Sequence, residues 1–404
     1  MTGRRVVVTG LGVQCPAGGT VDEAFAALLA AKGTAALLPG TDGRHRLACR
    51  VDAFDPDAYF SPREARVLDR GTQLGVAAAL DAFADAGLAG RTPDGRWCTI
   101  VGTGGAGLAA EAERVMVRDA GAVNARTVPK LMPSSTAAWL SMRLGLTGPA
   151  LTIATACASG TNAIGEAFQA IRSGRCDAAL TGGTEAPVSD LVLEGFYRSR
   201  ALSRRTGDPA AASRPFDADR DGFVLGEGAA FLVLEDLYTA RARGARIHCE
   251  LAGYATNADA HHIVAPLEDG SRAAACMRAA LDDAGVAPDE VAHVNAHGTA
   301  TLLNDRSEAA AIRRCFNGAG PPVTAPKGVV GHMIGAAGAF EAVVMATSVR
   351  TGRVPPVANH RAQPDGDAEI TVVRDRPADV GPGPAISNSF GFGGHNASLV
   401  MVPA

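Results

Sequence analysis

The chain has 404 residues, of which 47% are hydrophobic and 20% are charged, and its formal net charge is −4. This is the composition of a globular protein with a large core, which excludes an intrinsically disordered chain. The slightly acidic balance gives no electrostatic reason to expect nucleic acid as a partner. The eight cysteines form no CxxC pair and a chain of this length needs no disulfides, so reduced thiols are expected.

The N-terminal residues pass directly into a strand pattern, without the long apolar segment that is typical of a signal peptide. No stretch of about twenty uninterrupted apolar residues occurs, so no membrane span is expected. These observations together predict a cytoplasmic protein.

Short apolar strand patterns alternate with alanine-rich helical patterns, which predicts an α/β fold with buried sheets. In chain order, strands are expected at residues 5–11, 97–102, 178–182, 229–235, 248–255, 293–297, 322–325, 370–373, 384–388 and 397–402. Helices are expected at residues 21–31, 71–86, 134–144, 161–173, 271–284, 305–316 and 336–350. The polar segment 202–224 is expected to be a structured loop on the surface.

Segments 158–173 and 335–350 are alike, because in each a glycine corner is followed by a helix rich in small residues. This likeness indicates an ancient duplication, with an N-terminal half at residues 1–250 and a C-terminal half at residues 251–404. No low-complexity linker divides the chain, so the halves are expected to pack as one unit.

Cys157 lies at the predicted corner between the apolar run 151–154 and helix 161–173, among small neighbours. A helix N-terminus carries partial positive charge and unpaired backbone N–H groups, which favour a thiolate. Small neighbours also leave room for a substrate to approach. A buried cysteine is usually only a small hydrophobic residue, and the other seven fit that interpretation. Cys157 is therefore the candidate nucleophile.

Two histidines downstream are candidate partners for this cysteine. His297 ends a predicted strand before a glycine corner, a place where open α/β sheets present side chains to ligands; the alternative is a histidine packed at a turn. His293 lies four residues earlier, but metal-binding pairs at this spacing belong on helices, so no metal site is expected. His332 lies between glycines, and Lys327 could hold a carboxylate or the substrate; the alternative is a loop lysine and a surface histidine.

Two glycine-rich loops complete the set of motifs. Segment 102–107 follows a strand and matches G-x-G-x-x-G, but no second strand ends in an acidic residue about twenty positions on, which disfavours a dinucleotide site. In segment 388–396, Phe390 and Phe392 alternate with glycines. This pattern suits a mobile lid over a hydrophobic tunnel, or two core aromatic residues beside a tight turn.

Taken in order, these motifs resemble those of the β-ketoacyl-acyl-carrier-protein synthases of the thiolase superfamily, particularly the elongating type. The segments that carry the resemblance span nearly the whole chain and are 155–160, 212–217, 221–228, 295–301, 327–338 and 388–396. The resemblance implies a thiolase-like, five-layered αβαβα fold of two pseudo-symmetric halves. It also implies a dimeric acyltransferase, a 3-oxoacyl-acyl-carrier-protein synthase.

The resemblance further implies that Cys157 takes an acyl chain from an acyl carrier protein as a thioester. His297 and His332 would then stabilise the enolate that forms when malonyl carrier protein loses carbon dioxide. No metal or cofactor is implied, because phosphopantetheinyl carrier protein delivers both the acyl and the malonyl groups.

Supporting residues follow from the same resemblance. Lys327 and Glu308 would form an ion pair near His332. The backbone N–H groups of Cys157 and Phe392 would form an oxyanion hole.

The substrate pocket implied by the resemblance is lined by Gly105, Thr299, Thr301, Phe390 and Phe392. Gly105 stands where elongating fatty-acid enzymes often carry a bulkier residue. A deeper pocket, suited to longer or stiffer chains, is therefore expected.

The pathway and the dimer partner stay open at this point. Segments 259–262 and 304–308 resemble ketosynthase subunits of type II polyketide systems as much as fatty-acid enzymes, which slightly favours a polyketide or polyene pathway. The partner is an identical copy or a chain-length-factor-like paralogue. A non-catalytic partner subunit is one alternative, but such subunits characteristically lose the nucleophile. A non-decarboxylating thiolase or acyltransferase is another, and the histidine pair in place of a second cysteine argues against it.

Overall fold

The computed structural model describes residues 3–40, 45–93, 95–118 and 123–404. Its strands are β1 (Val6–Gln14), β2 (Ala36–Pro39), β3 (His45–Cys49), β4 (Trp97–Gly102), β5 (Ala150–Ile153), β6 (Ala178–Glu185), β7 (Leu225–Gly226), β8 (Gly228–Asp236), β9 (Cys249–Ala258), β10 (His293–Asn295), β11 (Val323–Thr324), β12 (Arg353–Val354), β13 (Ala378–Asp379), β14 (Ala385–Gly391) and β15 (His395–Val402). Its α-helices are α1 (Val21–Leu29), α2 (Pro62–Val67), α3 (Arg70–Asp85), α4 (Ala106–Glu113), α5 (Thr127–Leu131), α6 (Ser135–Leu144), α7 (Ser159–Arg172), α8 (Asp190–Arg198), α9 (Leu237–Ala242), α10 (Ser271–Ala284), α11 (Leu302–Phe316), α12 (Lys327–Val330) and α13 (Ala337–Thr351).

The central sheet has ten strands in the order β11-β10-β14-β15-β9-β1-β8-β6-β4-β5. These strands form two groups, β5-β4-β6-β8-β1 and β11-β10-β14-β15-β9. When the strands of each group are numbered along the chain, both groups have the spatial order third, second, fourth, fifth, first. In each group the first three strands are parallel and the last two run antiparallel to their neighbours. The groups meet where β1 pairs antiparallel with β9, from Val6 opposite Leu251 to Val8 opposite Cys249. In chain order β9 is the first strand of the second group, and it begins at Cys249, next to residues 250 and 251.

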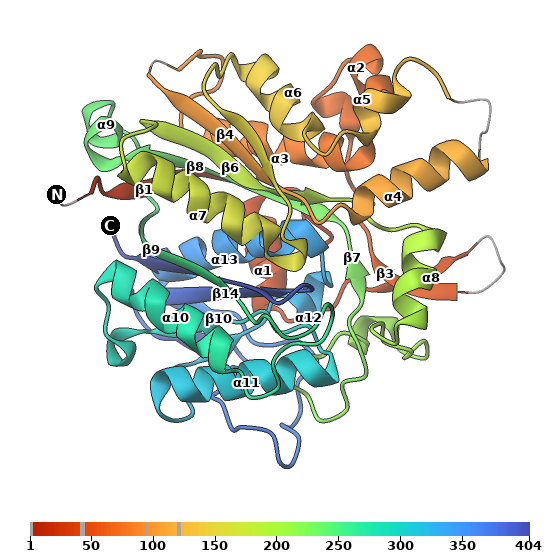
Figure 1. Cartoon of the computed structure of the whole chain (residues 1–404), viewed down its shortest axis with the longest axis vertical. Coiled ribbons are helices and arrows are strands. Elements are labelled where there is room, and N and C mark those ends of the chain that lie inside the picture. The colour runs from red at the N-terminus through yellow and green to blue at the C-terminus, as the bar shows by residue number, and fades with distance from the viewer. Residues whose placement is uncertain (1–2, 41–44, 94, 119–122) are drawn as a thin grey trace.

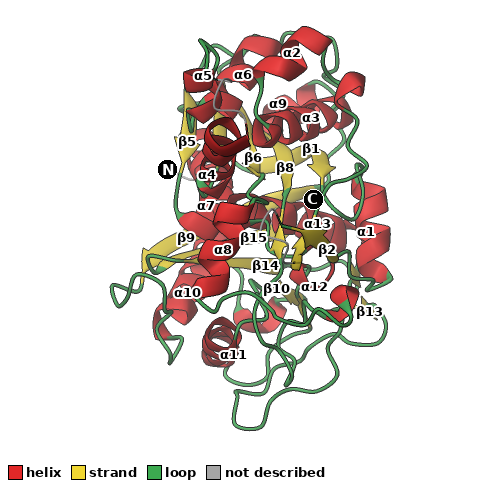
Figure 2. Cartoon of the chain, turned by 90° about the vertical axis from the view of Figure 1, so that its right-hand side faces the viewer, coloured by secondary structure: helices red, strands yellow, loops and turns green. Residues whose placement is uncertain are grey.

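Helices and strands stack in five layers (Figure 1). Helices α3 and α6 cover the outer face of the first group of strands, and α10 covers the outer face of the second group, with α11 beside it. Helices α7 and α13 lie between the two groups and contact both. Figure 2 shows the same stacking from the side, with strands between helices. This is the thiolase-like αβαβα fold that the resemblance implied.

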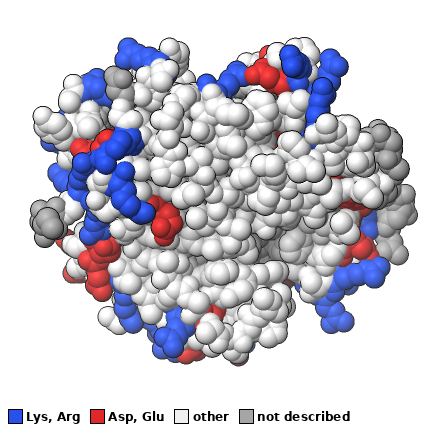
Figure 3. Space-filling view, turned by 45° about the horizontal axis from the view of Figure 1, so that its top comes forward, with Lys and Arg blue, Asp and Glu red and all other residues white. Residues whose placement is uncertain are grey.

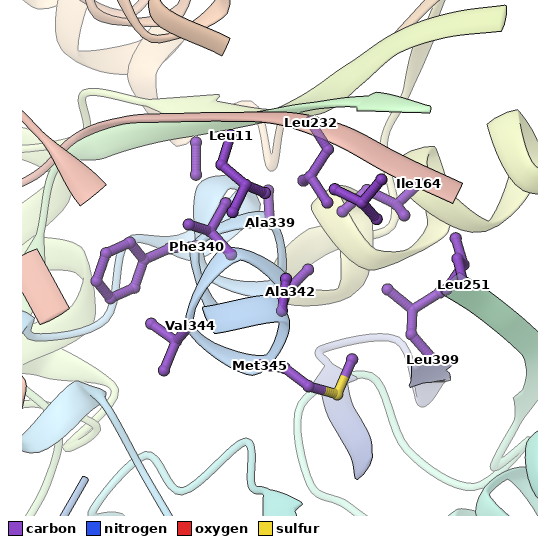
Figure 4. Close-up of a cluster of buried hydrophobic side chains, with 14 of the residues drawn as sticks. Leu11, Ile164, Leu232, Leu251, Ala339, Phe340, Ala342, Val344, Met345 and Leu399 are labelled. Carbon is purple, nitrogen blue, oxygen red and sulfur yellow. The ribbon is translucent and has the colours of Figure 1, made fainter. Parts of the chain in front are cut away.

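The middle layer forms the centre of the hydrophobic core. Figure 4 shows α13 surrounded by buried side chains from β1, β8, β9, β15 and α7, among them Leu11, Leu232, Leu251, Leu399 and Ile164. All residues of α13 from Ala337 to Val349 are buried. Burial on every side explains why this helix has small and apolar residues all round rather than along one stripe.

Two glycines allow α7 and α13 to approach closely. A β-carbon at Gly160 would lie 2.8 Å from the backbone nitrogen of Ala339, and one at Gly338 would lie 2.0 Å from Thr161 Oγ1. Real β-carbons do not approach other atoms this closely, so glycine is required at both positions.

The structure corrects two expectations about elements. Residues 370–373 form no strand; Val372 makes only an isolated bridge to Val323. Segment 202–224 is structured as predicted, but residues 212–217 are buried rather than on the surface. They can be buried because their backbone groups find partners: Phe216 N–H donates to Asp305, and the Asp217 carboxylate accepts from Arg361 N–H.

Several short elements were not anticipated, notably the three-stranded sheet β2-β3-β7 and helices α4 and α8. Among the described residues, none of the helices combines the length and the apolar character needed to cross a bilayer.

We predict that Gly338→Ala lowers the free energy of unfolding by about 1–3 kcal/mol, because the added methyl group overfills the contact between α7 and α13. Urea unfolding followed by circular dichroism measures the change. The matched control is Gly195→Ala on the exposed side of α8, where a β-carbon meets no atom within 4 Å. That variant should be stabilised by about 0.5–1 kcal/mol. Equal stability of Gly338→Ala and the unmodified chain would contradict the prediction.

Candidate active site

Cys157 lies in a tight turn between β5 and α7. The turn is a 3₁₀ segment, Ala156–Ala158, and Ala156 has a left-handed backbone with φ of 49°. Ser159 Oγ accepts a hydrogen bond from Thr155 N–H at 2.9 Å, and the side-chain amide of Asn162 donates to Thr155 Oγ1 at 2.8 Å. These bonds fix the turn, so Cys157 stands at the corner predicted from sequence.

His297 and His332 come from the second half of the chain and are almost fully buried. Their rings lie 5.3 Å apart, nearly perpendicular at 84°. His332 Nε2 lies 3.1 Å from Cys157 Sγ. One ring nitrogen of each histidine and the sulfur of Cys157 all lie within 4.8 Å of one another. The structure therefore brings together the three side chains that the sequence singled out.

Backbone hydrogen bonds hold both histidine loops. His332 N–H donates to Val224 O at 2.7 Å, and His332 O accepts from Gly226 N–H at 2.9 Å. Glu308 on α11 accepts from the backbone N–H groups of His297 and Gly298, each at 2.8 Å.

The far nitrogen of each imidazole faces a donor, which fixes its tautomer. Ile334 N–H points at His332 Nδ1 at 3.3 Å, and Lys327 Nζ lies 3.2 Å from His297 Nδ1. A neutral imidazole that accepts at Nδ1 carries its proton on Nε2. Both histidines are therefore Nε2–H donors directed into the site.

The same polarity argues against a metal site at this cluster. Histidine ligands usually donate their second N–H to a carboxylate or carbonyl, which frees the other nitrogen for the metal. Here both second nitrogens accept, so the two Nε2 atoms hold protons where a metal would need lone pairs. The donor set Cys157, His297 and His332 is compact enough for zinc but has the wrong protonation for it.

Burial keeps the two imidazoles neutral. It lowers the pKa of both His297 and His332 well below the ordinary value, and the positive charge of Lys327 lowers them further. Neutral histidine is a hydrogen-bond donor throughout the physiological pH range, so neither ring acts as a charged group.

The expectation of a resting thiolate is wrong. Burial raises the pKa of Cys157 to about 11, although Lys327 and the backbone N–H of Phe392 both favour the ionised form. The loss of hydration at the closed corner outweighs these two favourable contacts. The resting thiol is protonated at neutral pH.

The predicted ion pair between Lys327 and Glu308 is also wrong. Lys327 pairs with Glu341 on α13 and donates to the carbonyl oxygen of His297 at 2.6 Å. Glu308 instead caps the His297 loop, as described above. Burial raises the pKa of Glu308 and of Glu341 to about 7 in each case. Glu341 was missed, yet it is the only charged residue between 337 and 349, and a lone charge inside a buried helix signals a partner.

A second missed residue is Glu185 at the end of β6. Its buried carboxylate accepts from the backbone N–H groups of Gly104, Gly107 at 2.6 Å and Gly335 at 3.3 Å. Burial raises the pKa of Glu185, and these hydrogen bonds oppose the rise. Glu185 thus ties the glycine-rich loop of the first half to the turn that follows His332.

The resemblance implied that the backbone N–H groups of Cys157 and Phe392 form an oxyanion hole. Phe392 N–H is directed at the Cys157 thiol, and a β-carbon on Gly391 would lie 3.1 Å from the Cys157 nitrogen. The glycine at 391 therefore lets the β14–β15 turn approach the nucleophile.

A cavity of about 520 Å³ opens onto this site. Its lining includes Cys157 and both histidines, together with Thr299, Thr301, Phe390 and Phe392. Lys327 and Glu308 are not part of this lining. Aromatic rings surround the histidines: Phe223 is 5.3 Å from His332 and Phe390 is 6.0 Å from His297, measured between ring centroids.

Gly105 is not part of this lining, although its neighbours Gly104 and Ala106 are. It precedes α4 with φ of 82°, and a β-carbon there would meet no atom within 4 Å. A side chain at Gly105 would be strained by its backbone rather than by lack of space. The expectation that Gly105 lines the pocket is therefore wrong.

Comparison with known proteins identifies the family to which the chain is similar. Residues 3–240 match the family described as Beta-ketoacyl synthase, N-terminal domain, and residues 248–361 match Beta-ketoacyl synthase, C-terminal domain. The chain is 40% identical over 410 residues to 3-oxoacyl-[acyl-carrier-protein] synthase 2 of Staphylococcus aureus (strain N315), covering 98% of each chain.

Solved structures give the same result. The ishigamide ketosynthase/chain length factor superposes with a TM-score of 0.91 at 35% identity, covering 100% of both chains. A type II PKS ketosynthase, solved in complex with its acyl-carrier protein, superposes with a TM-score of 0.90 at 30% identity, again covering 100% of both chains.

We predict that alkylation of Cys157 by iodoacetamide accelerates about tenfold per pH unit between about pH 7 and pH 9, because only the thiolate reacts and its fraction rises as the pH approaches a pKa of about 11. Peptide mapping by mass spectrometry measures the rate at this residue, and Cys157→Ala identifies the labelled peptide. A rate independent of pH down to about pH 6 would indicate a resting thiolate and contradict the prediction.

Proposed function

Since the chain belongs to the β-ketoacyl synthase family of condensing acyltransferases, we propose that it condenses an acyl chain held on Cys157 with malonyl-acyl-carrier protein. The observation that carries this proposal is the buried contact of Cys157 Sγ with His332 Nε2, beside a second histidine that is also a neutral donor. The presence of all three side chains argues against a non-catalytic partner subunit.

In the proposed first step, Cys157 Sγ forms a bond to the acyl carbonyl carbon and the thioester bond to the carrier breaks. The thiol proton ends on the sulfur of the departing carrier. Negative charge on the carbonyl oxygen would be stabilised by the backbone N–H groups of Cys157 and Phe392.

In the second step, malonyl carrier protein occupies the cavity and its carbon–carboxylate bond breaks. Carbon dioxide leaves, and the electron pair passes into an enolate whose oxygen accepts from Nε2–H of His297 and His332. The enolate carbon attacks the carbonyl carbon of the acyl group, and the bond between that carbon and Cys157 Sγ breaks. Cys157 leaves as a thiolate and is reprotonated by water. The product is a β-ketoacyl chain, two carbons longer, on the carrier.

Lys327 and Glu308 act in this proposal as positioning residues. Lys327 sets the tautomer of His297, and Glu308 holds the backbone of the same residue. Thr299 and Thr301, whose hydroxyl groups lie 2.9 Å apart on the cavity wall, would contact the phosphopantetheine arm. No resident metal or cofactor is proposed, since the donor polarity described above suits hydrogen bonding.

The proposed carrier-dependent pathway is fatty-acid elongation or, slightly favoured, type II polyketide or polyene synthesis. The Staphylococcus aureus relative supports the first and the two ketosynthase structures support the second. Intact-mass analysis of Cys157 after incubation with saturated and polyunsaturated acyl carriers distinguishes these pathways by the chains that are retained.

We predict that Cys157→Ala abolishes condensation while carbon dioxide release from malonyl carrier protein persists. His332→Ala should lower carbon dioxide release about 100-fold, because loss of one donor to the enolate costs about 3 kcal/mol. Release of labelled carbon dioxide and formation of the β-ketoacyl product are measured on each variant. His45→Ala, at an exposed position on β3 outside the cavity lining, serves as a histidine control that leaves carbon dioxide release unchanged.

Two outcomes would contradict this assignment. Condensation by Cys157→Ala would remove the cysteine from the reaction, and undiminished carbon dioxide release by His332→Ala would remove the histidine.

A partner chain of the same fold is also proposed. Strand β5 lies at the edge of the sheet, pairs only with β4 among the described strands, and exposes half of Leu151. Met132, Met142 and Val128 add exposed apolar surface on α6 and on or just after α5. Figure 3 shows a broad face with few charged side chains. An exposed apolar edge strand favours pairing with another chain.

We predict that Leu151→Lys makes the protein monomeric, because a charge on the β5 edge opposes strand pairing. Light scattering after size-exclusion chromatography measures the mass. Tyr238→Ser, at an exposed position on α9, is the control that leaves the mass unchanged. An unmodified chain that dimerises alone indicates an identical partner, and one that dimerises only on co-expression indicates a paralogue. A dimeric Leu151→Lys variant would rule out this edge.

A further inference from the structure

The loop from Thr299 to Thr301 presents a strained backbone beside the active-site cavity. Ala300, between the two threonines, is fully buried and has a left-handed conformation with φ of 66°. A residue with a β-carbon keeps such a conformation only where its surroundings impose it. The 2.9 Å separation of the two threonine hydroxyl groups on the cavity wall therefore depends on the contacts that impose this backbone.

The N–H side of the loop is held by Asp305 on α11. One carboxylate oxygen accepts hydrogen bonds from Thr299 N–H at 3.0 Å and from Ala300 N–H at 3.2 Å. The other oxygen accepts from Phe216 N–H at 2.7 Å. Burial raises the pKa of Asp305, whereas backbone hydrogen bonds and the positive charge of Arg220 oppose the rise. The arginine thus helps to keep this acceptor ionised.

The carbonyl side of the loop is held by two residues of the segment that precedes β7. Gly222 N–H donates to Ala300 O at 3.0 Å. The guanidinium group of Arg220 donates from Nε to Thr301 O at 3.3 Å and from Nη2 to Leu302 O at 3.2 Å. Three successive carbonyl groups are therefore held by Arg220 and Gly222 together.

The remaining contacts of Arg220 anchor the guanidinium group itself. Nη1 donates to Asp217 O at 3.0 Å, and Nη2 also donates to the Asp367 carboxylate at 2.8 Å. Nε lies 3.8 Å from Asp305 Oδ2. The residue is only 5% exposed. A planar fork of donors can serve all these acceptors at once, which a lysine ammonium group cannot do.

Arg220 reaches the substrate only through this loop. Thr299 and Thr301 line the cavity, whereas Arg220 is not part of the lining. A phosphopantetheine arm carries two amide groups, so hydroxyl groups held at one separation favour one placement of the arm. Their positioning affects how the arm binds, and it does not involve the bonds that form and break at Cys157.

We propose that Arg220 is a positioning residue for substrate recognition, which acts through the backbone of Thr299 and Thr301 to fix the two hydroxyl groups that contact the amide groups of the phosphopantetheine arm. This inference rests on the proposed function. It assigns to Arg220 a part in binding the arm and no part in carbon dioxide release.

Arg220→Lys tests this role, because lysine keeps the positive charge and lacks the fork that reaches both carbonyl groups. The substrates are malonyl-pantetheine, which has both amide groups, and malonyl ethanethiol thioester, which has none. For malonyl-pantetheine, KM should rise about five- to tenfold, as for loss of a well-placed hydrogen bond, and kcat should change less than about twofold. For the ethanethiol ester, kcat/KM should change less than about twofold. Release of labelled carbon dioxide measures each value.

A double-mutant comparison separates positioning from a general loss of structure. Thr299→Val/Thr301→Val lacks both hydroxyl groups, so adding Arg220→Lys to it should change KM for malonyl-pantetheine less than about twofold. Arg243→Lys is the matched control. Arg243 likewise pairs with a carboxylate, that of Glu235, and donates to a backbone carbonyl group, and it is not part of the cavity lining. This variant should leave all values unchanged.

Unchanged KM for malonyl-pantetheine in a folded Arg220→Lys variant would overturn the proposal. An equal loss with the ethanethiol ester, or an undiminished effect in the valine background, would also overturn it. If Arg220→Lys does not fold, Asp367→Ala carries the same test, because it removes one anchor of the guanidinium group and should raise KM for malonyl-pantetheine alone, about threefold. Failure of the unmodified chain to release carbon dioxide from either substrate would instead refute the proposed function.

Discussion

The close approach of α7 and α13 determines where a reaction centre can form in this fold. Each helix follows a 3₁₀ turn that begins with a left-handed residue, Ala156 with φ of 49° and Ile334 with φ of 45°. Because Gly160 and Gly338 allow the helices to touch, these two turns lie side by side. The first turn supplies Cys157, and His332 lies two residues before the second turn. Neither half of the chain holds the site by itself, which gives a functional reason for the halves to pack as one unit.

A buried ammonium group then determines what the site can do. Removing the charge of Lys327 from water is costly, and the pairing with Glu341 and the bond to the His297 carbonyl offset much of that cost. In return, Lys327 fixes the tautomer of His297 and lowers the pKa of both imidazoles. The histidines are thereby held as neutral donors and cannot serve as strong bases.

The sequence predicted the residues of the centre better than their contacts. Cys157, His297 and His332 each sit at a corner marked by a strand end or flanking glycines, and strand Trp97–Gly102 was predicted to the residue. The partner of Lys327 was not predictable in this way, because Glu308 and Glu341 both lie on helices and only the packing of α13 decides between them. The prediction of a thiolate at Cys157 was wrong for a related reason. The helix N-terminus that favours a thiolate can be recognised in the sequence, whereas the depth of burial that outweighs it cannot.

Burial and neutral donors act together in the proposed decarboxylation. A malonyl carboxylate in this cavity would lie among Phe390, Phe392 and neutral histidines, since the charge of Lys327 is compensated by Glu341. A desolvated carboxylate is destabilised, and it loses its charge when it becomes carbon dioxide. The charge moves to the thioester oxygen, where two Nε2–H groups are already oriented. A protonated histidine would bind the carboxylate of the ground state as well as the enolate, so neutrality directs the stabilisation to the transition state.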